Sequence, residues 1–212
     1  MNNAERIRNE KLGASLIKAL ALRHFDAYYC ASSSEAAEKI LSLIPKTDVV
    51  SWGGSMTMEA LGVIDRVKKG GWRVIDRSTA QSQEEKIEIT RSALLCDTYL
   101  TGANAISEDG EIVNVDGIGN RVAAMTFGPK SVVVACGINK VVKTAQDALS
   151  RARNTAAPVN AQRFDIRTPC KTTGTCADCK STDSICSYIV RTRLCKPAGR
   201  IKVVLIGEAL GF

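Results

Sequence analysis

The sequence predicts an α/β fold built on a mainly parallel sheet, and two observations carry this prediction. Strand-like and helix-like segments alternate along most of the 212 residues, and such alternation requires crossover connections between parallel strands. The run SVVVAC at 131–136 is β-branched and apolar without alternation, as expected of a strand buried on both faces. The length suits one large domain, 1–212, with a small cysteine-rich segment at 168–196 inside it.

The first part of the chain predicts three helices separated by short strands. Apolar residues recur at three- and four-residue intervals over 4–24, the pattern of an amphipathic helix. Serines at 32–34 offer N-caps to a second helix, and Pro45 ends it. Gly70-Gly71 ends the third helix. In chain order we expect a helix at 4–24, a strand at 26–30, a helix at 35–44, a strand at 47–51, a helix ending near 69 and a strand at 72–76.

The second part of the chain continues the alternation and adds a hairpin. Asp109-Gly110 lies between Ile106 and the apolar pair 112–113, and this dipeptide favours a two-residue hairpin turn. In chain order we expect a helix at 82–94, a strand at 97–101, the hairpin around 109–110, a helix at 119–127, a strand at 131–136, a helix at 141–157 and a last strand within 199–207.

Composition excludes two classes of partner and favours a third. The net charge is +7, yet the lysines and arginines are spread along the chain and aromatic residues are only 5%, which argues against nucleic-acid binding. No apolar run is long enough for a membrane span. The N-terminal residues, with Glu5 and Glu10, lack the apolar core of a signal peptide, so we expect a cytoplasmic protein. The positive charge favours small anions.

Glycines and small polar residues follow the predicted strands, and ligands of parallel sheets bind beyond the carboxyl ends of strands. In the loop SWGGSMT at 51–57, glycines let backbone N–H groups approach an anion and hydroxyls add donors. A tight turn with Ser55 as N-cap explains the same residues without a ligand. The residues that we expect to bind a small carboxylate or phosphate are Gly53, Gly54, Ser55, Thr57, Gly102, Asn104, Asp116, Gly117, Gly119, Asn120, Asn139 and Lys140.

Few residues of this edge suit acid–base chemistry. Lys140 offers an ammonium for a substrate carboxylate or phosphate, although a lysine at the start of a helix is more often solvated. Asp116 and Glu208 are the candidate acid–base residues, and Asn104 is a third candidate for a catalytic role. The sequence carries no strong acid–base pair, and its single histidine, His24, is expected as a cation at a helix C-terminus, which argues against histidine-based triads.

The eight cysteines divide into two groups. Cys30, Cys96 and Cys136 lie in apolar strand-like runs and are expected to be small buried side chains. Five others crowd into 26 residues, and four of these have the spacing C-x5-C-x2-C-x6-C. This spacing is neither a zinc ribbon nor a ferredoxin motif. Zinc, an iron–sulfur cluster and unliganded reduced thiols all remain open, with Cys170, Cys176, Cys179 and Cys186 as the metal ligands.

Two stretches carry a resemblance to a known family. "TGANAISEDGEIVNVDGIGNRVAAMTFGPKSVVVACGINKVV" at 101–142 resembles the characteristic region of the LUD domain family, proteins of the lactate-utilisation type formerly called a domain of unknown function. "SWGGSMTMEALG" is similar to the glycine-serine loop of that family, and "GRIKVVLIGEALGF" to the end of its short members. The resemblance covers essentially the whole chain.

The resemblance implies a fold and a functional context. The fold would be Rossmann-like, with helices on both faces of the sheet, as in the NagB, RpiA and CoA-transferase group. In that group the glycine-serine-threonine loop binds an anionic group, a role that would fall to Gly53, Gly54, Ser55 and Thr57. Better-known members serve iron–sulfur-dependent oxidation of lactate, which implies iron–sulfur proteins as partners and lactate or another organic acid as substrate. A homo-oligomer is a further expectation.

Three functions stay open at this point. The first is an enzyme or subunit of organic-acid oxidation. The second is a non-catalytic accessory or ligand-sensing protein, in which the cysteines form a structural or electron-handling module. The third is a sugar-phosphate isomerase, because residues 102–120 also resemble the "GAD…NG…N…GT" segment of sugar-1-phosphate isomerases and related initiation-factor subunits. The catalytic aspartate of those isomerases corresponds to Asn104, and an amide cannot act as a general base.

Overall fold

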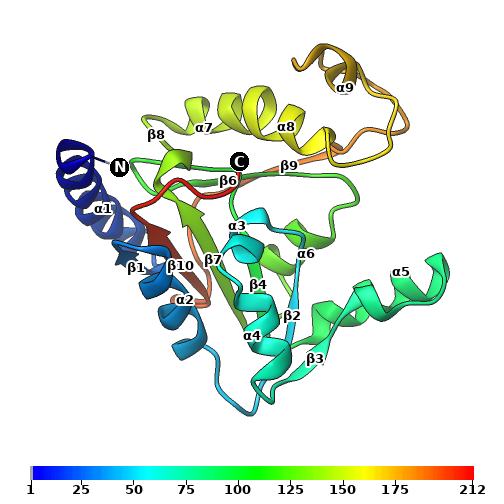
Figure 1. The fold of residues 1–212 in the computed structure, drawn as a ribbon, viewed down its shortest axis with the longest axis horizontal. Helices are drawn as coiled ribbons and strands as arrows, with labels where there is room; N and C mark the ends of the chain where they lie inside the picture. The colour runs from blue at the N-terminus through cyan, green and yellow to red at the C-terminus, as the bar shows by residue number, and fades with distance from the viewer. Residues whose placement is uncertain (1) are drawn as a thin grey trace.

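A six-stranded parallel sheet forms the centre of the molecule in the computed structural model, which describes residues 2–212 (Figure 1). The strand order β1-β10-β7-β4-β2-β3 requires crossover connections, so the predicted α/β fold is confirmed. The apolar runs predicted as strands all lie in this sheet: β1 (Asp26–Cys30), β2 (Val49–Trp52), β3 (Arg73–Ile75), β4 (Thr98–Gly102), β7 (Ser131–Gly137) and β10 (Ile201–Ile206).

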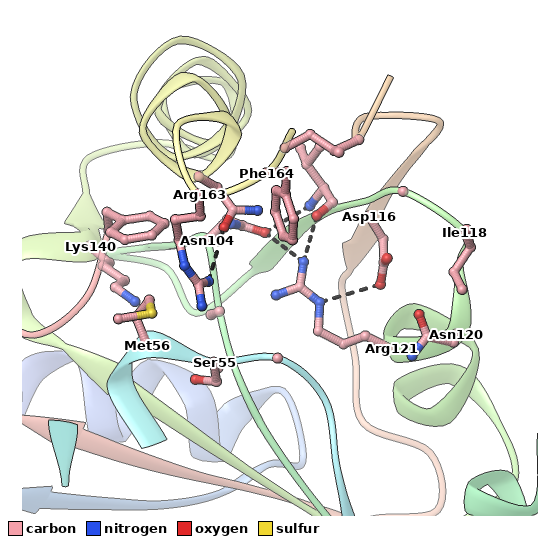
Figure 2. Close-up of a pocket in the computed structure, with 18 of the residues that line it drawn as sticks. Ser55, Met56, Asn104, Asp116, Ile118, Asn120, Arg121, Lys140, Arg163 and Phe164 are labelled. Carbon is pink, nitrogen blue, oxygen red and sulfur yellow. Dashed lines mark hydrogen bonds and ion pairs between the residues drawn. The ribbon is translucent and has the colours of Figure 1, made fainter. Parts of the chain in front are cut away.

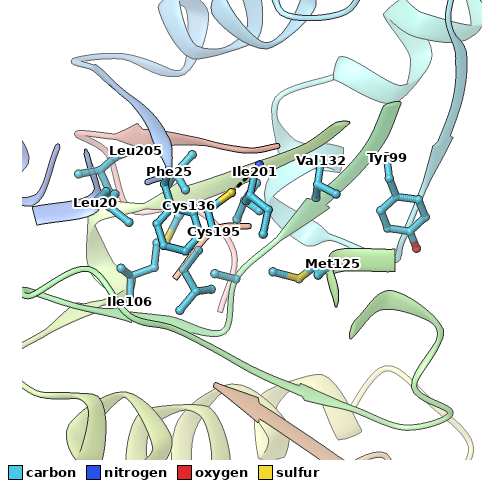
Figure 3. Close-up of a cluster of buried hydrophobic side chains, with 14 of the residues drawn as sticks. Leu20, Phe25, Tyr99, Ile106, Met125, Val132, Cys136, Cys195, Ile201 and Leu205 are labelled. Carbon is cyan, nitrogen blue, oxygen red and sulfur yellow. Dashed lines mark hydrogen bonds between the residues drawn. The ribbon is translucent and has the colours of Figure 1, made fainter. Parts of the chain in front are cut away.

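Helices cover both faces of this sheet, as the resemblance implied. On one face, α2, α3 and α4 pack on Val50, Leu100 and Val133. On the other face, α1 and α6 pack on alternate residues of the same strands, among them Tyr99 and Val132 (Figure 3). The helices of these two layers are α1 (Asn3–Leu22), α2 (Ser33–Ser42), α3 (Met56–Ala60), α4 (Val63–Lys69) and α6 (Asn120–Thr126), while α5 (Gln83–Ser92) has no buried residue.

A second, four-stranded sheet was not predicted. Its order is β8-β5-β6-β9, with β5 (Ala105–Ser107) and β6 (Ile112–Asp116) forming the predicted hairpin. The turn is longer than predicted: Ser107 N–H donates to the Glu111 carbonyl across three loop residues, and Gly110 has φ 90°. The other strands are β8 (Val141–Val142) and β9 (Tyr188–Thr192). One face packs on the main sheet through Ile106 and Ile112, and the other on α7.

Two predicted helices differ from the structure. The helix expected to end near 69 is broken by Gly62, which has φ 63° and separates α3 from α4. The helix expected at 141–157 begins later, because its first two residues extend the second sheet as β8. It then runs as α7 (Ala145–Arg151), a π-helical turn (Ala152–Ala156) and α8 (Ala157–Ala161), followed by the short α9 (Pro169–Thr173). Throughout residues 2–212, no helix combines the length and the apolarity that crossing a membrane requires.

Candidate functional site

A cavity of about 320 Å³ lies beyond the carboxyl ends of β2 and β4, between α3, α6 and α8 (Figure 2). Eight of the twelve residues that we expected to bind a ligand line it: Gly54, Ser55, Gly102, Asn104, Asp116, Gly117, Asn120 and Lys140. These residues come from segments up to 86 positions apart. The glycine and polar residues that follow the strands therefore do meet at one edge of the sheet, as parallel strands require.

The glycine-serine loop forms the floor of this cavity and also caps a helix. The Ser55 hydroxyl accepts the Met58 N–H at 3.3 Å, as the N-cap of α3. A Cβ at Gly102 would lie 2.7 Å from Ser55 Oγ, so the end of β4 can approach the loop this closely only without a side chain. Ser55 is thus both the predicted N-cap and a lining residue of the cavity.

Lys140 is a buried cation without an acidic partner. It ends a short 3₁₀ turn after β7, and its side chain is only 3% exposed. Its Nζ donates to Thr57 Oγ1 at 2.9 Å and forms no ion pair with any carboxylate of residues 2–212. Burial lowers the pKa of Lys140, and the positive charges of Arg151 and Arg121 lower it further. A buried, unpaired charge is costly unless it serves a ligand.

Arg121 connects three residues of the cavity wall. Its Nε lies 3.4 Å from the Asp116 carboxylate, and Nη2 donates to Asn104 Oδ1 at 3.0 Å and to the Val115 carbonyl at 2.5 Å (Figure 2). Asp116 also accepts the Val122 N–H at 3.3 Å, near the start of α6. Asn104 Oδ1 accepts the Val115 N–H at 2.9 Å. Asp116 Oδ2 and Asn104 Oδ1 are therefore engaged in the wall, which leaves the Asn104 amide nitrogen for a ligand.

The lining of the cavity is strongly cationic. Arg77, Arg121, Lys140 and Arg163 all line it, and Asp116 is the one acidic side chain among the described residues of the lining. Figure 2 shows Arg121, Lys140 and Arg163 directed toward the same space from three separate segments of the chain. Like charges held this close favour an anionic ligand, because an anion between them removes their mutual repulsion.

Sequence reasoning missed the arginines of this site. Arg121 follows the predicted Asn120, and Arg77 follows the residue after β3, so both positions satisfied the rule that ligands bind beyond strand ends. Arg163 carried no such signal, since it follows α8 and reaches the cavity only because α8 lies across the sheet edge. Phe164 and Ile118 add apolar surface to the wall.

Five other predicted residues lie outside the lining. Thr57 lies beneath Lys140 as its hydrogen-bond partner. A Cβ added at Gly53 would lie 3.1 Å from Tyr99 Oη and 3.5 Å from Arg121 Cγ, and one added at Gly119 would lie 3.1 Å from the Tyr188 ring. Asn139 binds the backbone of residues 210 and 211. Glu208 accepts the N–H of Ser33 at 3.1 Å and lines a different cavity, beside α1.

The cysteines form two groups in the structure, and Cys195 lies with the buried ones rather than with the four whose spacing suggested a metal site. Cys170, Cys176, Cys179 and Cys186 all line one second cavity, of about 470 Å³. Burial, and then the nearby Cys170, Cys176 and Cys179, raise the pKa of Cys186 to about 11. Across residues 2–212, no three Cys, His, Asp or Glu side chains are close enough together to hold one metal ion. Cys30, Cys96, Cys136 and Cys195 are buried, and the Cys195 sulfur accepts the Ile201 N–H at 3.2 Å (Figure 3).

Comparison with known proteins decides the family. The profile of the LUD domain matches residues 14–206. The chain belongs to the LUD domain family. This confirms the resemblance of residues 51–62 and 101–142. No curated protein matches the chain.

Solved structures agree with this assignment at the level of the fold. This LUD domain is similar to a DUF162 family protein from Deinococcus radiodurans, with a TM-score of 0.52 and 14% identity, over 95% of this chain and 97% of that one. Ribose 5 phosphate isomerase A from Neisseria gonorrhoeae matches with a TM-score of 0.35 and 15% identity, over 53% of this chain and 54% of that one. eIF2B delta from Chaetomium thermophilum matches with a TM-score of 0.34 and 18% identity, over 63% of this chain and 54% of that one.

Proposed function

We propose that this LUD domain binds a small anionic metabolite, a carboxylate or a phosphate, in the cavity at the carboxyl ends of β2 and β4. The observation that carries the proposal is Lys140, which is buried and has no carboxylate partner within residues 2–212. An ordinary structural lysine extends its ammonium into water. A ligand anion would supply the missing counter-charge, with Arg121 and Arg163 beside it.

The size and wall of the cavity favour a small organic acid. A volume of about 320 Å³ is at the lower end of ordinary ligand pockets, which hold roughly 300–1,000 Å³. Phe164 and Ile118 offer apolar contacts to a short carbon chain, and the Asn104 amide offers a donor to a hydroxyl or keto oxygen. Lactate and pyruvate have these features, so they are the first ligands to test.

The contacts of the titratable groups favour ligand binding without catalysis at this cavity. Asp116 Oδ2 accepts from Arg121 Nε and from the Val122 N–H, so this carboxylate positions Arg121 and the start of α6. Glu208 lies in another cavity. The isomerase alternative has no support here, because Asn104 occupies the aspartate position and its oxygen is engaged. We therefore propose an accessory or ligand-sensing role in organic-acid metabolism.

A thermal-shift screen tests the proposal, since a ligand that binds the native state raises the unfolding midpoint. Lactate, pyruvate, phosphate, sugar phosphates and CoA esters are compared with lactamide and glycerol, which are neutral. We expect at least one small anion to raise the midpoint and the neutral compounds to leave it unchanged. An equal response to lactate and lactamide, or no response to any anion, would contradict the proposal.

A matched pair of arginine variants tests whether the anion binds in this cavity. Arg163 lines the cavity and is 37% exposed, with Glu59 at 3.8 Å. Arg66 is 44% exposed and pairs with Glu38 at 2.8 Å, away from the cavity. Arg163→Gln is expected to weaken anion binding several-fold, and Arg66→Gln to leave it unchanged. Equal effects of the two variants would indicate non-specific attraction to a basic protein.

We expect anion affinity to fall as the pH is raised, and this decline should begin at a lower pH than the deprotonation of an ordinary lysine. The pKa of Lys140 is lowered from 10.5, so the free protein loses this charge at a lower pH than a surface lysine does. The anion binds the charged form. Its affinity is therefore constant below the lowered pKa and falls by up to about tenfold per pH unit above it. Titration with lactate, which stays ionised throughout, measures this, and Lys140→Arg should remove the decline. A decline beginning only above 10.5 would contradict the assignment.

A further inference from the structure

Four cysteine side chains surround one cavity beside the anion site. Cys170 belongs to the short α9, and Cys176, Cys179 and Cys186 follow in the loops between α9 and β9. All four are partly exposed, unlike the other four cysteines, which are buried in the protein core. Four separate points of the chain thus direct a thiol toward a single space of about 470 Å³.

The spread of these thiols does not fit a single metal ion. A structural zinc ion needs four ligands about 2.3 Å from one point, and no three ligand side chains of residues 2–212 are that closely grouped. An iron–sulfur cluster distributes its four thiolate ligands over several iron atoms. It therefore suits thiols that surround a cavity rather than converge on one point.

The surroundings of the cavity also suit a cluster. A cluster with four thiolate ligands carries net negative charge. Two cations line the cavity, Arg153 and Lys180, with one carboxylate, Asp178, which pairs with both. The Arg153 guanidinium lies 3.9 Å from Cys176 Sγ, within the range of a hydrogen bond to sulfur. Ala157 and Pro158 of α8 and Ile189 of β9 form an apolar wall. Hydrogen bonds to the sulfurs and partial exclusion of water are what proteins use to stabilise and tune such clusters.

The segment that contains the cysteines lacks another source of stability. Between Cys170 and Cys186 the sequence has one large aliphatic residue, Ile185, and no residue of this stretch is buried. α9 has five residues. A loop region with so little apolar burial gains order from a bound metal group, because the binding free energy adds to folding.

We propose that Cys170, Cys176, Cys179 and Cys186 hold an iron–sulfur cluster in this cavity. The site shares walls with the anion site. α8 supplies Ala157 and Pro158 to the cysteine cavity and Asn160 to the anion cavity. Ile185, next to Cys186, lines the anion cavity and lies against Gly117, where an added Cβ would be 3.4 Å from Ile185 Cα. The cluster therefore fixes one wall of the proposed ligand site.

Metal analysis of the full chain tests this proposal independently of any metabolite. The protein is purified without oxygen, reconstituted with ferrous iron and sulfide, and desalted. We expect iron and acid-labile sulfide in equal amounts, with a visible absorption that bleaches on reduction. Cys179→Ser should lose most of the iron, whereas Cys30→Ala, a change in the core on the α2 face of the main sheet, should keep it. Circular dichroism and gel filtration check that Cys179→Ser remains folded.

A second measurement needs no variant. Alkylation of the native wild-type protein, mapped by mass spectrometry, should spare the four cysteines in the iron-loaded form and label them after chelation. Stoichiometric zinc without iron would overturn the proposal. So would the absence of iron after reconstitution, retention of iron by Cys179→Ser, or equal alkylation of the four cysteines with and without iron.

Discussion

Lys140→Met is expected to weaken anion binding strongly while making the ligand-free protein more stable. The buried ammonium has a lowered pKa and no carboxylate partner within the described residues, so an apolar side chain of similar length removes a desolvation cost. Substitutions that relieve such functional strain commonly add about 0.5–2 kcal/mol to the free energy of unfolding. Loss of a hydrogen bond to a charged group costs about 1.5–3 kcal/mol of binding, roughly a 10- to 100-fold weaker affinity.

Lys143→Met is the matched control. Lys143 lies three residues further on, is 77% exposed and pairs with Glu108. Its removal should change the free energy of unfolding by less than about 1 kcal/mol and leave anion binding intact. Urea unfolding and calorimetric titration measure both quantities. If Lys140→Met destabilised the protein and bound anions normally, Lys140 would be a structural residue.

Arg121→Met is expected to weaken both the fold and the site. The guanidinium joins Asp116, Asn104 and the Val115 carbonyl, and its side chain is only 15% exposed. Its loss leaves a nearly buried carboxylate without a cation, which costs about 2–4 kcal/mol of stability. The cavity also loses one of its positive charges, so anion affinity should fall at least about tenfold.

Arg23→Met is the control that separates the loss of stability from the loss of anion affinity. Arg23 is 17% exposed and pairs with Asp109 and Glu111 at the hairpin, away from the cavity. It also donates to the Arg193 carbonyl at 3.0 Å. This variant should lose comparable stability and keep anion affinity when both proteins are titrated well below their unfolding midpoints. Equal losses of affinity in the two variants would mean that stability, not charge in the cavity, controls binding.

The main sheet could be predicted from sequence because its signals are local. The apolar runs at 131–136 and 201–206 show burial on both faces, and the Asp109-Gly110 turn shows the hairpin. The second sheet could not be predicted, because β9 is half exposed and joins β6 from 72 residues further along the chain. The break at Gly62 was also missed, since a single glycine inside a helical pattern is often tolerated.

The site was predictable where it follows strand ends and not elsewhere. Gly54, Ser55, Asn104 and Lys140 meet because parallel strands end at one edge. The burial of Lys140 could not be predicted from sequence, because it depends on Thr57 and on the backbone of residues 210 and 211 lying beside it. Arg163 was missed because it follows a helix and reaches the cavity through tertiary packing.

The location of a bound anion tests the central claim most directly. A crystal structure is determined with the small acid that gives the largest thermal shift, at a saturating concentration. We predict its carboxylate or phosphate within hydrogen-bond distance of Lys140 Nζ, with Arg121 or Arg163 as a second partner. An anion bound elsewhere, or a cavity that stays free of the acid under these conditions, would contradict the account.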